Sequence, residues 1–118
     1  IDEALKIKDK SFSNSDINFS IGDVRNLKFA DSSFDVVYTT RVLINLPTWA
    51  DQIIAIEECL RILKKGGRLI LSEGFWEPLC LLNAIRGTCQ LPPLVEHDFN
   101  RYLKINKLIE FLQYKKLS

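Results

Sequence analysis

The fold is decided by residues 22–73, where GDVRNLKFADSSFDVVYTT (22–40) is followed, after a helical run, by RILKKGGRLILSE (61–73). The β-branched and aromatic run Phe34–Thr40 predicts a strand that is buried on both faces. A second apolar run, Arg68–Ser72, predicts the next strand. A strand, a helix and a second strand in this order predict a βαβ unit with parallel strands.

The predicted helix between these strands has both a start and a stop signal. Thr48 stands at the N-cap position, and Asp51 lies in the first turn. Gly66 follows two lysines at the place where a residue in the left-handed conformation would end the helix. Apolar residues at helical spacing predict the face that packs on the sheet: Trp49, Ile53, Ile56, Leu60 and Leu63.

Four further elements are predicted around this unit. Residues 1–10 have the apolar spacing of a helix, and residues 17–21 alternate apolar and polar side chains like a short strand. Residues 78–86 predict a helix with proline near its start and glycine after its end. Residues 102–114 predict an amphipathic helix, with an inward face of Ile105, Leu108, Ile109 and Leu112.

Polar side chains stand at the carboxyl ends of the predicted strands. Asp23 follows residues 17–21, Thr39 and Thr40 end the central strand, and Glu73 follows the last one. Ligands of open α/β sheets bind just beyond these ends. The sequence therefore predicts one binding crevice at this edge of the sheet.

Composition narrows the class of protein. The 118 residues, 47% of them apolar, predict a single globular domain over residues 1–118, and a net charge of +1 gives no case for nucleic acid or an anionic membrane as partner. The three cysteines and one histidine lack the spacing of a metal site or a disulfide framework. No apolar run reaches the roughly 18 residues of a membrane span. We therefore expect a cytoplasmic protein with reduced thiols and no bound metal.

Taken together, these segments resemble class I S-adenosylmethionine-dependent methyltransferases. GDV (22–24), SFDVV (33–37) and RILKKGGRL (61–69) follow the order of the family's GD, SFDVV and RVLKPGG segments. The resemblance covers residues 1–75 and implies a partial Rossmann-like, doubly wound sheet of three α/β/α layers, incomplete at both ends. It also implies that residues 76–118 form the acceptor-side cover and the last helix.

The resemblance implies S-adenosylmethionine as cofactor. Asp23 would accept a hydrogen bond from the adenine amino group, a role that suits an ionised carboxylate because it only accepts. The Val24 backbone would meet the edge of the ring. The methionine part would lie along the end of the central strand, with one apolar residue beside the adenine; these positions are Thr39, Thr40, Arg41 and Leu46. Asp23 has a second interpretation, as the cap of the turn that follows it.

The catalytic residue is left open. The sulfonium is an activated methyl donor, so that alignment and desolvation supply much of the rate and no metal is needed. Asn45 stands where many relatives carry histidine. The candidates for taking a proton from the acceptor are Glu73, His97, Tyr38 and Glu77.

The family also has segments that this sequence lacks. They are a glycine-rich turn and an acidic strand end on the N-terminal side, and an antiparallel hairpin after the last helix. In the family's strand order, 3-2-1-4-5, two strands would separate residues 17–21 from residues 34–40 by about 14 Å. Buried strands need backbone partners, so we expect further polypeptide, closure of the two strands or a second chain to fill the gap. The isolated chain is then expected to bind the cofactor weakly or not at all and to be inactive.

Three functions remain under consideration. The first is methyl transfer to a small-molecule acceptor by an enzyme of which this chain is a fragment. The second is a non-catalytic, methyltransferase-like interaction module. The third, a nicotinamide-dependent oxidoreductase, also requires an N-terminal glycine motif and fits residues 23–67 less well.

Overall fold

The computed structural model describes residues 17–116. Along the chain, its elements are β1 (Phe34–Thr40), the 3-10 helix η1 (Leu43–Asn45), α2 (Trp49–Ile62), β2 (Leu63–Ser72), α3 (Trp76–Thr88) and α4 (Ile105–Tyr114). β1 and β2 are parallel neighbours, with Thr39 opposite Leu71 and Thr40 opposite Ser72. This confirms the predicted βαβ unit and the α/β class. The helix predicted over residues 1–10 lies outside the described residues.

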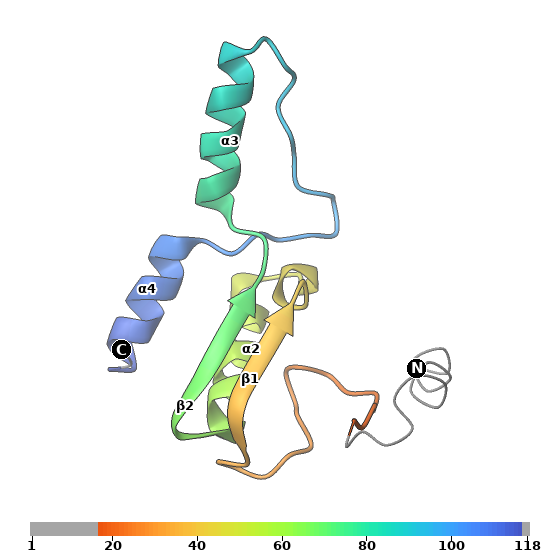
Figure 1. Cartoon of the computed structure of the whole chain (residues 1–118), viewed down its shortest axis with the longest axis vertical. Helices are drawn as coiled ribbons and strands as arrows, with labels where there is room; N and C mark the ends of the chain where they lie inside the picture. Colours follow the sequence, from red (N-terminus) through yellow and green to blue (C-terminus); the bar gives the residue numbers. More distant parts are fainter. Residues whose placement is uncertain (1–16, 117–118) are drawn as a thin grey trace.

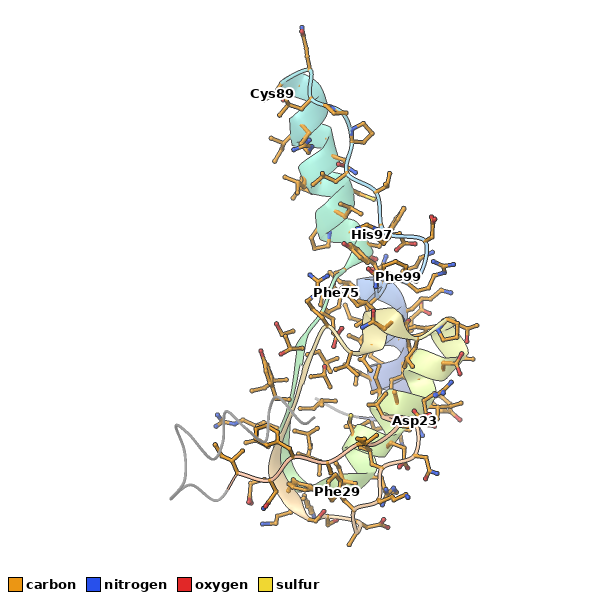
Figure 2. The ribbon with its side chains drawn as sticks, turned by 90° about the vertical axis from the view of Figure 1, so that its right-hand side faces the viewer. Asp23, Phe29, Phe75, Cys89, His97 and Phe99 are labelled. Atoms are coloured by element: carbon orange, nitrogen blue, oxygen red, sulfur yellow. The ribbon has the colours of Figure 1, made fainter. Side chains whose placement is uncertain are left out.

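The described part shows two of the three predicted layers. The sheet lies on one side, and α2 and α4 lie together on the other (Figure 2). Between them is a core of four fully buried residues, Leu43, Ala55, Ile56 and Leu103. Lys115, the residue that follows α4, pairs with Glu57 of α2 at 2.6 Å. α3 and the segment that returns from it project beyond the carboxyl ends of the strands (Figure 1).

The prediction that β1 is buried on both faces is wrong for the described residues. Thr39 is only 5% exposed, whereas Val36, Tyr38 and Ile70 are 51%, 60% and 47% exposed. Alternate side chains of a strand point to opposite faces. In residues 17–116, helices cover only the face that Thr39 shares, so the other face of both strands is open.

Residues 17–21 do not form the predicted strand, and Ile21 is 85% exposed. A strand needs a neighbour for its backbone groups, and within the described range β1 pairs with β2 alone. The chain beyond this segment lies along α2 instead. There the Leu27 N–H donates to Glu58 at 2.8 Å, and Arg61 donates to the Leu27 carbonyl at 2.9 Å.

The predicted start of α2 is confirmed, and its end differs. The Thr48 hydroxyl accepts from the Asp51 N–H at 3.1 Å, as an N-cap does. The helix stops at Ile62, three residues before the predicted lysine pair ends. Gly66 has the expected left-handed conformation, with φ of 78°, but it lies in a bulge of β2. A Cβ added at Gly67 would lie 2.9 Å from the Asp35 carbonyl, so the bulge requires glycine there as well.

The two later helices differ from prediction at their limits. α3 begins at Trp76 and includes Gly87, and the chain turns only at Gln90, where φ is 56°. α4 begins at Ile105 because the Glu77 carboxylate accepts the Ile105 N–H at 3.0 Å. Ile109, predicted to face inward, is 47% exposed, and Phe111 packs against the core. None of the helices in residues 17–116 is long and apolar enough to span a membrane.

Gln52 is a buried polar side chain that joins three segments. It is 2% exposed, and its Nε2 donates to the Leu43 carbonyl at 3.1 Å and to the Arg101 carbonyl at 2.6 Å. These bonds tie α2 both to η1 and to the segment before α4. They also place Gln52 on the buried side of α2, between positions that the sequence assigned to apolar residues.

Replacing Gln52 with alanine leaves both carbonyls without these donors and opens a cavity. We expect a loss of about 2–4 kcal/mol in the free energy of unfolding, measured by denaturant titration. Gln113→Ala, at an exposed position of α4, is the matched control and should change stability by less than about 0.5 kcal/mol. Equal losses in the two variants would contradict this role for Gln52.

Candidate functional site

The carboxyl ends of β1 and β2 are joined by backbone and carboxylate hydrogen bonds. The Arg41 N–H donates to the Ser72 carbonyl at 2.9 Å. The Glu73 carboxylate accepts from the N–H groups of Val42 and Ile44, at 3.1 and 3.4 Å. Arg41 has φ of 52°, a conformation that is costly for a residue with a side chain. The Glu73 side chain therefore holds a turn whose shape the backbone alone disfavours.

A second set of bonds closes the later part of the chain over this turn. Asn45 donates to the Arg41 carbonyl at 2.6 Å and accepts from the Asn100 side chain at 2.9 Å. The Arg101 N–H donates to the Ile44 carbonyl at 2.7 Å. Asn45 thus has a structural role here. The sequence analysis missed Asn100, which is 5% exposed, because its partner is 55 residues away.

The structure brings four predicted site residues to this edge of the sheet. Thr39 and Thr40 end β1, Arg41 follows it, and Glu73 follows the end of β2. Thr40 and Arg41 are exposed, while Thr39 lies on the covered face. The buried Thr39 hydroxyl has no hydrogen-bond partner among the described residues. Leu46, just after η1, is half-buried and packs against the core.

Asp23 has different surroundings from those that the resemblance implied. Its carboxylate accepts from the Arg25 N–H at 2.9 Å and from the Arg25 guanidinium at 2.8 Å. Arg25 also pairs with Asp51, in the first turn of α2, at 3.2 Å. Figure 2 shows Asp23 beside α2. The side-chain hydrogen bond from Arg25 lowers the pKa of Asp23 from 3.8 to about 2. The structure thus shows the turn-capping role, and no hydrogen bond or ion pair within residues 17–116 links the Asp23 side chain to the end of β1. Val24 is half-buried and packs against the core.

The catalytic candidates do not converge. Glu73 and Glu77 hold backbone N–H groups, and the bond from Ile105 is the main cause that lowers the pKa of Glu77. The His97 ring stacks on the Phe99 ring near the base of α3, with 5.4 Å between the ring centres (Figure 2). Tyr38 lies on the open face of the sheet, where the hydroxyl of Thr40, and then that of Ser72, lowers its pKa.

Comparison with known proteins gives consistent results. A family model described as a methyltransferase domain matches residues 1–71. The chain is 43% identical over 58 residues to a demethylmenaquinone methyltransferase of Paenarthrobacter aurescens. This match covers 49% of this chain and 22% of that protein. It is also 34% identical over 100 residues to an uncharacterized methyltransferase of Schizosaccharomyces pombe. This second match covers 82% of this chain and 31% of the relative.

A solved structure shares the fold. It is a SAM-dependent methyltransferase of Thermotoga maritima, described as a possible histamine N-methyltransferase, with 25% sequence identity and a TM-score of 0.52. The match covers 79% of this chain and 42% of that one. The chain therefore spans less than half the length of each of these three relatives. With a family model that matches most of its length and a parallel βαβ unit in the expected order, the chain belongs to the methyltransferase domain family.

Proposed function

We propose that this chain is part of an enzyme that transfers a methyl group from S-adenosylmethionine to a small-molecule acceptor. The observation that carries the proposal is the parallel β1–β2 pair, whose polar ends lie at one edge, in a chain that the methyltransferase model matches over residues 1–71. The names of the relatives, demethylmenaquinone methyltransferase among them, support a small acceptor.

The residues at the strand ends fit the methionine part of the cofactor. The cofactor, when bound, supplies an activated methyl group. Thr40 and Arg41 are exposed donors that would hold its carboxylate, and an Arg guanidinium is suited to a carboxylate because its donors form a planar fork. The Thr39 hydroxyl, which has no hydrogen-bond partner within residues 17–116, would supply a further polar group, and Leu46 would supply an apolar contact for the adenine.

The fit at Asp23 is conditional on Arg25. The Asp23 carboxylate is occupied by hydrogen bonds from Arg25, so it can accept the adenine amino group only after part of that pairing is given up. Both side chains are at least 40% exposed, so solvent can replace the lost contacts at small cost. We therefore propose that Asp23 and Val24 join the adenine site once Arg25 has moved.

We further propose that α3 and residues 89–103 are the acceptor-side cover. They project beyond the strand ends (Figure 1). Several of their apolar side chains are exposed, namely Leu81, Ile85, Val95 and Phe99. Residues 1–75 would then hold the cofactor, and residues 76–118 would close over the acceptor.

The second candidate, a non-catalytic interaction module, is favoured by one observation, the ion pair that occupies Asp23. In that case the strand ends would be a scaffold, and Arg25 would stay on Asp23 whatever ligand is added. The two functions therefore differ in how the Asp23 region responds to a cofactor analogue.

Titration of the nitrogen-15-labelled chain with S-adenosylhomocysteine tests the enzyme proposal. We expect weak, saturable shifts of the amide signals of residues 22–24 and 39–46, and Asp23→Asn should weaken the binding. Asp98→Asn, at an exposed turn, is the matched control. Shifts confined to α3, or equal affinity in the two variants, would count against the assignment of Asp23.

A second prediction concerns the Asp23–Arg25 pair alone. Because the pKa of Asp23 is lowered to about 2, the pair contributes stability above pH 3.8, and this contribution is lost as the pH falls through 2. Arg25→Gln should raise the pKa of Asp23 toward 3.8, measured by carbon-13 NMR of the carboxyl group. Arg86→Gln is the control, because among the described residues the Arg86 guanidinium donates only to the Pro92 carbonyl. This variant should leave the pKa of Asp23 unchanged. An unchanged Asp23 pKa in the Arg25 variant would refute the pairing.

A further inference from the structure

A cavity lies at the first turns of α2, α3 and α4. Its volume is about 280 Å³, and three of the side chains that line it are aromatic: Trp49, Trp76 and Tyr102. Pockets for small ligands run from roughly 300 to 1,000 Å³, so this one suits a ligand with a single ring. None of the predicted cofactor-binding or catalytic residues lines it.

The charged groups around the cavity are mostly positive. Arg101, Lys104 and Lys107 line it, and in the described structure none of them is ion-paired with a carboxylate. The only acid in the lining is Glu96, whose carboxylate accepts the Tyr102 N–H at 2.9 Å. A ligand with a negative charge is therefore favoured, and a cation is disfavoured.

Several of these groups are held in place before any ligand arrives. The Arg101 guanidinium donates to the carbonyls of Asp98 and Asn100, at 2.8 and 2.7 Å. The Lys107 ammonium lies 5.9 Å from the centre of the Trp49 ring, within the range of a cation–π contact. Fixed donors lose little conformational entropy when a ligand binds.

Gln52 adds a buried polar group to the cavity wall. Its Nε2 is committed to two carbonyls, which fixes the orientation of the amide. In residues 17–116, no donor is hydrogen-bonded to its Oε1. This oxygen can accept a hydrogen bond from a hydroxyl or amino substituent of a ligand in the cavity.

We propose that this cavity binds a small aromatic carboxylate. The three rings offer stacking and edge contacts to a planar ligand. Arg101, Lys104 and Lys107 attract its carboxylate. This site shares no residue with the strand-end site, and its binding of a carboxylate does not require methyl transfer. Four of its lining residues, Trp76, Glu96, Arg101 and Tyr102, belong to the segments proposed above as the acceptor-side cover.

The chain contains its own probe for this site. Its two tryptophans, Trp49 and Trp76, both line the cavity, so every tryptophan of the protein reports on it. Titration with benzoate should change the tryptophan fluorescence saturably. Benzamide, which has the same shape without the charge, and benzylamine, which carries the opposite charge, should bind at least about tenfold more weakly, since a charged hydrogen bond is lost. A linear, unsaturable change with benzoate, or equal affinity for benzamide, would overturn the proposal.

A pair of double variants tests the charge directly. Lys104→Gln with Lys107→Gln should weaken benzoate binding about tenfold, because two cations leave the cavity. Lys64→Gln with Lys65→Gln removes the same charge from the bulge of β2 and should have no effect. Equal weakening in both would show a response to net charge only and would refute the site. Failure of S-adenosylhomocysteine to bind would leave these outcomes unaltered.

Discussion

The turn between β1 and α2 depends on one carboxylate. The N–H groups of Val42 and Ile44 in this turn belong to no strand or long helix. The Glu73 carboxylate, just after the end of β2, accepts a hydrogen bond from each of them. These two hydrogen bonds link the segment that follows β1 to the residue that follows β2. Arg41 can then keep a left-handed conformation at the strand end. The edge where a ligand would bind is thus set by a side chain that sequence reasoning offered as a proton acceptor.

At the same edge of the sheet, some residues hold the chain together and others are free to contact a ligand. Asn45 and Asn100 hold the later chain over η1, while Thr40 and Arg41 stay exposed. Asn45 is held by these bonds and offers no basic group at this edge. In the methyltransferase interpretation, rate enhancement comes chiefly from orientation and desolvation of an activated donor, which does not require a base at this position.

Local signals predicted much of the fold. The Thr48 cap and the β-branched run of β1 each depend on neighbours within a few residues, and both are confirmed. Gly66 has the predicted left-handed conformation, but it lies within β2 and does not end α2, which stops at Ile62. Residues 17–21 carried an equally clear strand pattern, but a strand also needs a partner, which the described chain does not provide. Gln52 was missed because its burial depends on a carbonyl 49 residues away. The polar strand ends were found, whereas the pairing of Asp23 with Arg25 depends on side-chain geometry that the motif does not specify.

The central claim is that the ends of β1 and β2, together with residues 22–24, form one side of a cofactor crevice. A crystal structure of the protein with S-adenosylhomocysteine tests it most directly. The account predicts the amino acid part beside Thr40 and Arg41, the adenine beside Val24, and Arg25 withdrawn from the Asp23 carboxylate. A ligand bound elsewhere while the Asp23–Arg25 pair stays intact would contradict it.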